Sequence, residues 1–170
     1  MVRICSLLLM STALLAASGV LADDSVTVAL ASNDVGTLHV DATLGAAVNT
    51  EFLLDTGSAY VVLTDSTRRR LASEGALTPV RQLRAVMANN TTARAQVYRV
   101  SALRLSSGCV VREFEAVALP GARKDILGLS ALRSVAPFTV HLEPLHLELN
   151  CSAPSDGPPV IAALDVAASH

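Results

Sequence analysis

The chain has 170 residues, of which 51% are hydrophobic and 16% charged, and its formal net charge is −2. A charge this close to zero gives no electrostatic reason to expect a nucleic acid or an acidic surface as partner. Tryptophan is absent and aromatic residues make up only 3% of the chain, so an aliphatic core is expected. About 150 residues remain after the apolar N-terminus is set aside, which is enough for one domain with a hydrophobic core.

The first 22 residues have the pattern of an export signal. A short basic start precedes an almost wholly apolar run from Ile4 to Ala17, and Val20–Ala22 supplies small-residue cleavage chemistry. The sequence therefore predicts a signal peptide at residues 1–22, an exported protein (periplasmic or secreted) and no stable membrane insertion once the signal is removed. The apolar run approaches the ~20 residues that a spanning helix needs, so an uncleaved N-terminal anchor is the alternative.

Residues 26–63 have the pattern of β-strands. Val26–Leu30 is expected to be a first strand, residues 37–44 alternate apolar and polar with period two, and residues 48–54 form a third strand after a small-residue turn. The alternation in 37–44 places His39 and Asp41 on the solvent-facing side, away from any catalytic role.

The third strand ends abruptly at Asp55-Thr56-Gly57-Ser58, and a second apolar run follows at residues 59–63. Asp and Gly are poor strand formers, so the chain is expected to turn here. A carboxylate at the end of a buried strand is costly unless hydrogen bonds or a second charge centre compensate it, which favours a functional Asp55. Thr56 can donate a hydroxyl, and Gly57 lets backbone or a partner approach closely.

A short helix and a hairpin are expected next. Thr64–Ser66 can cap a helix that runs through Ala72 and stops at Gly75. Two strand-like runs between Arg81 and Val100 surround the residues Ala88-Asn89-Asn90-Thr91. Asn tolerates the left-handed conformations that hairpin tips require, so Asn89-Asn90 is predicted to be the turn.

The C-terminal half predicts two more hairpins and a brief helix. Residues 103–105 and 110–119 form the first hairpin, residues 130–133 the helix, and residues 138–142 and 145–149 the last hairpin. In the last hairpin the alternation sends a set of aliphatic side chains to the core: Val140, Leu142, Leu145, Leu147 and Leu149. It sets His141 opposite His146 on the solvent-facing side, with Glu148 nearby. We expect these to be exposed side chains and not a metal site.

The cysteines and the C-terminus leave one alternative open. Cys109 and Cys151 remain after signal removal, and both a disulfide and two separate thiols are compatible with the sequence. Residues 152–170 are predicted to be a flexible tail.

Two apolar residues, then Asp55-Thr56-Gly57-Ser58, then an apolar strand resemble the active-site loop of aspartic proteases. The run Ile126-Leu127-Gly128, preceded by Asp125, resembles the apolar-apolar-Gly strand that packs beside that loop in the same family. A single Asp-Thr-Gly in a chain this short is similar to the retroviral-type, retropepsin-like branch, in which two identical chains each supply one Asp. The resemblance spans residues 26–149.

The resemblance implies an all-β, single-domain acid-protease barrel over residues 23–151, with one or two short helices, assembled as a homodimer. It implies an aspartic endopeptidase that acts on a peptide or protein substrate without metal or cofactor. Asp55 is then the catalytic residue, with Thr56, Gly57 and Ser58 as its supporting loop, and Thr56 bonds across to the partner loop.

In the same family the hairpin after the acidic loop is the flap that closes over the substrate. This assigns the flap to Ala88, Asn89, Asn90 and Thr91, with Asn90 where relatives usually have Gly. The alternative is a catalytically silent dimeric β-domain that binds an exported protein or peptide. A silent copy has no chemical need to keep Asp55, which favours the enzyme.

Overall fold

The structure is a computed structural model, and it describes residues 25–87 and 90–151. In these ranges the chain is mostly β, with two short α-helices and one 3₁₀ turn. The strands are β1 (Ser25–Ala29), β2 (Ala31–Ser32), β3 (Leu38–Leu44), β4 (Val48–Leu54), β5 (Val61–Leu63), β6 (Leu77–Val86), β7 (Thr92–Leu105), β8 (Val110–Ala118), β9 (Asp125–Leu127), β10 (Phe138–Leu142) and β11 (Leu145–Asn150). The expected all-β class is confirmed.

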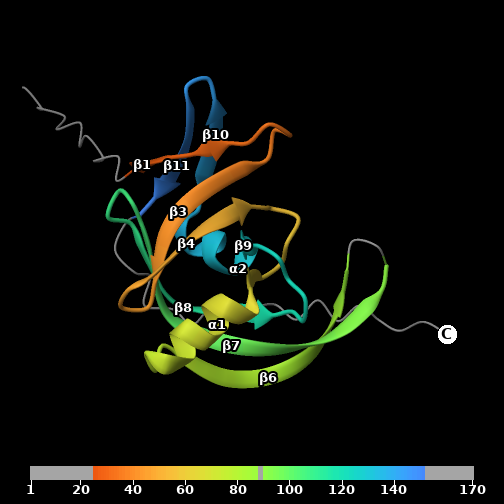
Figure 1. The fold of residues 1–170 in the computed structure, drawn as a ribbon. Coiled ribbons are helices and arrows are strands. Elements are labelled where there is room, and N and C mark those ends of the chain that lie inside the picture. Colours follow the sequence, from red (N-terminus) through yellow and green to blue (C-terminus); the bar gives the residue numbers. More distant parts are fainter. Residues whose placement is uncertain (1–24, 88–89, 152–170) are drawn as a thin grey trace, which may run out of the picture.

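Six strands form a barrel at the centre of the molecule (Figure 1). The larger sheet has the order β2-β3-β4-β9-β5-β8-β7-β6, and an additional β3–β7 pairing closes the six strands from β3 to β7 in that order into the barrel. Its interior is filled mainly by aliphatic side chains, as the composition predicts. Among the largest fully buried residues are Leu44, Phe52, Leu63, Leu103 and Leu127.

The second sheet has three antiparallel strands in the order β1-β11-β10. Leu147 and Leu149 of β11 are fully buried in the same core cluster as the barrel residues, and Val140 and Leu145 pack against it. The expectation for Leu142 was wrong, because its side chain is 71% exposed. Leu142 is in the last pair of the hairpin, opposite Leu145, where the sheet has already extended past the barrel.

Helix α1 (Asp65–Ser73) follows β5 and begins where the sequence predicts. The Thr64 side chain accepts a hydrogen bond from the backbone N–H of Thr67, which satisfies a donor that the first turn leaves unpaired. Gly75 ends the helical segment at a φ of +68°, a conformation that glycine adopts without steric cost. The second helix, α2 (Leu129–Leu132), begins one residue earlier than expected and leads into the 3₁₀ turn η1 (Arg133–Val135).

His39 is buried, with 5% of its surface exposed, so the solvent-facing assignment was wrong. Strand β2 pairs with β3 so that Ala31 lies opposite His39, and the following turn folds over the ring. The Nε2 atom lies 2.9 Å from Thr37 Oγ1, and Nδ1 lies 2.9 Å from Glu51 Oε1 without the alignment of a hydrogen bond. Alternation gives the side of a strand that a residue occupies, but it does not reveal a segment that covers that side.

The two cysteines form a disulfide, with their Cα atoms 5.7 Å apart. Cys109 precedes β8 and Cys151 follows β11, so the bond ties the three-stranded sheet to the barrel. The predicted signal peptide and the tail at 152–170 lie outside the described residues. Over the described ranges, neither helix has the length and apolar character needed to cross a membrane.

Candidate active site

Strand β4 ends at Leu54, and Asp55 begins a tight turn directly after it. The backbone N–H of Asp55 donates to the carbonyl of Leu127 at 3.1 Å, which continues the β4–β9 pairing by one residue. The N–H of Gly57 donates to Asp55 Oδ1 at 2.8 Å, and the N–H of Ser58 donates to the Asp55 carbonyl at 3.2 Å. The Asp55 carboxylate is therefore held in one orientation by its own loop and remains only half-buried.

Thr56 and Gly57 form the exposed tip of this loop, beside the carboxylate. A Cβ added at Gly57 would lie 3.1 Å from Asp55 Oδ1, so a side chain there would crowd the oxygen that the Gly57 N–H binds. Ser58 turns back into the molecule, and its hydroxyl donates to the Tyr60 carbonyl at 2.7 Å. The predicted loop residues Asp55, Thr56, Gly57 and Ser58 thus form one continuous, hydrogen-bonded turn.

The strand predicted to pack beside the loop does so. Leu53 and Leu54 of β4 pair in parallel with Ile126 and Leu127 of β9. The N–H of Leu129 donates to the Ser58 carbonyl at 2.9 Å. A Cβ at Gly128 would fall 2.7 Å from that same carbonyl, closer than real side chains approach, so this position has room only for glycine.

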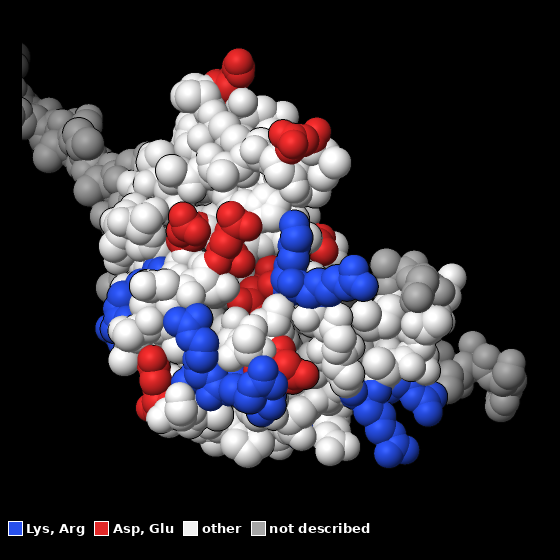
Figure 2. Space-filling view, in the orientation of Figure 1, with Lys and Arg blue, Asp and Glu red and all other residues white. Residues whose placement is uncertain are grey.

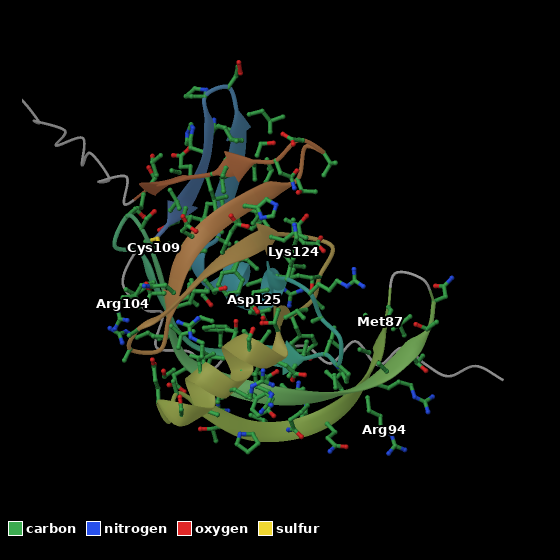
Figure 3. The ribbon with its side chains drawn as sticks, viewed as in Figure 1. Met87, Arg94, Arg104, Cys109, Lys124 and Asp125 are labelled. Atoms are coloured by element: carbon green, nitrogen blue, oxygen red, sulfur yellow. A yellow bond between two sulfur atoms is a disulfide. The ribbon has the colours of Figure 1, made fainter. Side chains whose placement is uncertain are left out.

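Asp125, at the start of β9, is a second carboxylate close to the loop in the fold, and sequence reasoning did not assign it a role. Figure 3 shows Asp125 near the centre of the view, between β9 and α1. The residue is 3% exposed, and its oxygens accept three hydrogen bonds. The donors are the Thr64 N–H at 2.6 Å, the Thr67 hydroxyl at 2.6 Å and the Thr50 hydroxyl at 2.7 Å. Asp125 therefore joins β4, the start of α1 and β9 from within the fold. The available signal was a charged residue at the head of an otherwise apolar strand.

The β6–β7 hairpin forms the other side of the candidate site. Asn90 has a φ of +60°, the left-handed conformation predicted for this turn. The N–H of Met87 donates to the Thr91 carbonyl at 2.8 Å, and the Asn90 N–H donates to the Met87 carbonyl at 2.8 Å. Ala88 and Asn89 of the predicted flap lie outside the described residues.

The hairpin and the acidic loop lie on the same side of the molecule, on the right in Figure 1. A small apolar cluster lines the inner face of the hairpin. It consists of buried Val62, Ala95, Val97 and Val117, with Tyr60, Leu83, Ala85, Leu119, Ala122 and Ile126 packed against it. Ile126 belongs to β9, which pairs with β4 next to the acidic loop, and Tyr60 follows that loop, so the cluster connects the hairpin to the region of the loop.

The two histidines of the β10–β11 hairpin lie away from the acidic loop. His141 and His146 stack with ring centroids 4.1 Å apart, and His141 Nε2 lies 2.9 Å from Glu148 Oε2, which confirms the predicted cross-strand arrangement. This group is on the three-stranded sheet, apart from Asp55. Among the described residues no group of three or more His, Cys, Asp or Glu side chains is placed to hold a metal ion. Basic and acidic side chains are interspersed on the face drawn in Figure 2.

Comparison with known proteins agrees with this geometry. A family profile described as "gag-polyprotein putative aspartyl protease" matches residues 40–134, more than half of the chain. A retropepsin-like aspartic protease from Rickettsia conorii has the same fold, with a TM-score of 0.52 and 19% sequence identity over 74% of this chain and 89% of that one. No curated protein sequence matches the chain. The matched segment contains the acidic loop, the hairpin and β9, and the chain therefore belongs to the retropepsin-like aspartic protease family.

Proposed function

We propose that the protein is an aspartic endopeptidase whose catalytic dyad consists of two Asp55 residues, one from each chain of a homodimer. The observation that carries the proposal is the half-exposed Asp55 carboxylate, oriented by the Gly57 N–H within a hydrogen-bonded loop. Family membership supports protease chemistry in general. The 170-residue sequence contains one Asp-Thr-Gly, and in this proposal the second carboxylate comes from another copy of the chain.

The proposed chemistry needs only these two carboxyls and water. Two carboxyl groups about 3 Å apart cannot both ionise cheaply, so they share one proton, as in aspartic proteases generally. The ionised Asp55 takes a proton from a water held between them, and that water attacks the scissile carbonyl. The protonated Asp55 donates to the carbonyl oxygen, so a tetrahedral intermediate forms without a covalent enzyme adduct. The titration then belongs to the pair and not to either residue.

The remaining loop and hairpin residues take supporting parts in this proposal. The exposed Thr56 hydroxyl is available to bond across to the partner loop, and Gly57 leaves space beside the carboxylate. The hairpin that carries Asn90 covers the bound peptide and excludes water. The partly exposed apolar side chains of this cluster, which include Leu83, Ala85 and Ile126, suit an extended peptide with apolar side chains.

The free sheet edges support assembly. In the β1-β11-β10 sheet the outer edges of β1 and β10 pair with no other strand of the described chain. Unpaired strand edges are templates for pairing with another chain. Export is proposed from the N-terminal sequence, and the Cys109–Cys151 disulfide supports an oxidising compartment.

The first test is loss of activity in Asp55→Asn, which removes the shared proton at nearly constant volume. Hydrolysis of casein should fall about 10³-fold or more, since acid–base groups contribute 10²–10⁴ in rate. Asp34→Asn is the matched control, because Asp34 lies in the exposed turn before β3 and should retain full activity. An active Asp55→Asn enzyme would remove the dyad assignment. A wild-type protein that binds peptides but cleaves none would instead favour the silent binding domain.

The second test addresses the two-chain dyad by mixing wild-type and Asp55→Asn protein under conditions that exchange subunits. After mixing in equal amounts, about one quarter of the dimers contain two Asp55 residues, so activity per wild-type chain should fall to about half. If each chain were a complete enzyme, activity per wild-type chain would not change. Sedimentation of the same samples gives the oligomeric state directly.

A further inference from the structure

A polar cluster of Tyr60, Arg81 and Glu115, named here the hinge cluster, joins the acidic-loop region to the base of the β6–β7 hairpin. The Glu115 side chain on β8 is 11% exposed, and both of its oxygens accept hydrogen bonds from the Arg81 guanidinium, with Nη2–Oε2 at 2.8 Å. A carboxylate with so little access to water is costly unless it is paired. The two-pronged geometry also fixes the direction of the Arg81 side chain.

Tyr60 connects this ion pair to the acidic loop. Arg81 Nη2 donates to the Tyr60 hydroxyl at 3.1 Å, and the Tyr60 carbonyl accepts the hydrogen bond from the Ser58 hydroxyl. Ser130 braces the same region, because its hydroxyl donates to the Glu115 carbonyl at 2.6 Å and accepts from the Val61 N–H at 2.8 Å. The side chain of the hairpin residue Arg81 is therefore linked through Tyr60 to the Ser58 side chain of the acidic loop.

Arg81 occupies a special position in its strand. The register of the β6–β7 pairing shifts between Pro79 and Arg81, which is where a β-bulge bends and re-aims a strand. The Gln96 side chain fastens this point, since its amide donates to the Arg81 carbonyl at 2.9 Å. Beyond Arg81 the hairpin carries Leu83 and Ala85 over the apolar cluster and ends at the Asn90 turn. Figure 1 shows β6 and β7 sweeping beneath α1 to the side of the molecule where the acidic loop lies.

The neighbouring arginines Arg99 and Arg84 form no ion pair with Glu115 in the described residues. Arg99 is directly opposite Glu115 in the β7–β8 register, yet its Nε is 4.0 Å from Glu113 Oε2. Arg84, three residues along β6 from Arg81, is exposed and has no ion pair with a described residue. Arg81 is thus the cation that compensates Glu115, and Arg84 offers a matched reference on the same strand.

We propose that Tyr60, Arg81 and Glu115 act as positioning residues that set the hinge of the β6–β7 hairpin relative to the Asp55 loop. The inference rests on the proposed protease function, because it gives the hairpin the task of closing over a peptide. The cluster holds the base of the hairpin at the bulge, so that closure brings Leu83 and Ala85 over the bound peptide in one geometry. Loosening the base weakens peptide binding before it affects the chemistry at Asp55.

The experiment compares Arg81→Met, the double variant Arg81→Met/Glu115→Gln, Tyr60→Phe and the control Arg84→Met. Arg81→Met leaves Glu115 nearly buried without its cation and should lower the melting temperature, because an uncompensated buried charge is strongly destabilising. The double variant removes that charge and should melt close to wild type. Any effect shared by both variants then belongs to the hinge and not to stability.

Two readouts are expected to move together. Amide hydrogen exchange in peptides from residues 82–87 and 90–96 should accelerate about 10-fold in Arg81→Met and in the double variant, as local opening becomes cheaper. The KM for a peptide substrate should rise about 10-fold in both while kcat changes by less than about 3-fold, because the hinge acts on binding and closure. Tyr60→Phe, which loses only the hydroxyl, should raise the exchange rate and KM in the same direction but by a smaller factor. Arg84→Met should match wild type.

Equal exchange rates in Arg81→Met and Arg84→Met would overturn the proposal. A double variant that recovers KM together with its melting temperature would also overturn it, since the cluster would then contribute stability alone. If the wild-type protein cleaves no peptide, the proposed protease function fails, but the exchange comparison still decides whether the cluster sets the hairpin.

Discussion

Two glycines lie against the Asp55 loop and they serve it in different ways. Gly57 donates its backbone N–H to Asp55 Oδ1 from within the loop, so it orients the carboxylate. Gly128 directly follows β9, and it lets the backbone there approach the carbonyls of Ser58 and Tyr60 more closely than any side chain would permit. The position of the carboxylate therefore depends on a backbone contact between segments about 70 residues apart in the sequence.

The contact predicts the effect of Gly128→Ala. Gly128 has a φ of −105°, which alanine adopts freely, so the added methyl acts only by displacing the Ser58–Tyr60 backbone. Overpacking of this kind costs about 1–3 kcal/mol of stability, and a displacement of about 1 Å at the loop should lower kcat up to about 10²-fold. Thermal unfolding and peptide kinetics measure the two effects.

Gly36→Ala is the control for this substitution. A methyl there meets no atom within 4 Å, but the φ of +79° makes the backbone unfavourable for alanine. It should lose about 1 kcal/mol of stability and keep its activity. If Gly128→Ala retains full activity as well, the close approach of β9 does not position the carboxylate.

At the scale of single elements, the buried Asp125 side chain joins β9 to its neighbours. Asp125 connects β9 to Thr50 of β4 and to Thr64 and Thr67 at the start of α1. A carboxylate beside a helix N-terminus is also favoured by the helix dipole. Because Asp125 precedes the segment that packs on the acidic loop, the placement of α1 and of the loop are linked through one buried group.

The β10–β11 hairpin carries a pH-dependent contact. The hydrogen bond from His141 lowers the pKa of Glu148 below its usual value of 4.5, and Ser25 acts in the same direction. A carboxyl whose pKa is lower in the folded chain stabilises the fold above its unfolded pKa and loses that contribution as the pH falls through the folded value. Glu148→Gln should therefore melt slightly below wild type at pH 6, and the difference should be smaller at about pH 3, below the usual pKa of a glutamate.

The matched control for this contact is Glu143→Gln, which alters an exposed carboxyl in the turn of the same hairpin. This variant should melt like wild type at both pH values. An NMR titration of the Glu148 carboxyl in His141→Gln gives the cause directly, since the pKa should move back toward its usual value. A titration unchanged by the loss of His141 would contradict the assignment.

At the scale of the whole molecule, the disulfide is the covalent link between the barrel and the three-stranded sheet. Cys109 and Cys151 are 42 residues apart in the sequence, and closing a loop of that length restricts the unfolded chain substantially. The link also fixes β11, the central strand of the sheet whose edges we propose for assembly. Reduction should therefore affect both the stability of the fold and the proposed dimer.

The Cys109→Ala/Cys151→Ala variant tests this. It should lose about 2–4 kcal/mol of stability, which lowers the melting temperature by about 5–15 °C in a chain of this length. Its activity should also require a higher protein concentration, because a less firmly held sheet weakens assembly. Wild-type protein in reducing agent should behave like the variant. An identical melting temperature with and without reducing agent would show that the link carries no stability.

The sequence by itself determined the features that depend on residues close together in the chain. The apolar periods predicted the strands, Thr64 predicted the start of α1, and the abrupt change from Leu54 to Asp55 predicted the turn at Asp55. The order of the acidic loop, the hairpin and Ile126-Leu127-Gly128 was enough to identify the family, later matched by its profile. The strands, the helix start and the turn follow from backbone preferences and side-chain alternation, which act over a few residues, whereas the family follows from the resemblance of its motifs.

Tertiary structure alone decided the features that join distant segments. His39 was predicted on the wet side of its strand, yet β2 and the next turn bury it. Asp125 accepts hydrogen bonds from threonines up to 75 residues away in the sequence. Glu115 pairs with Arg81 at a separation of 34 residues, and Cys109 is bonded to Cys151 at a separation of 42. Such contacts depend on how the strands are ordered in the barrel, and alternation within one strand carries no information on which other segment will cover it.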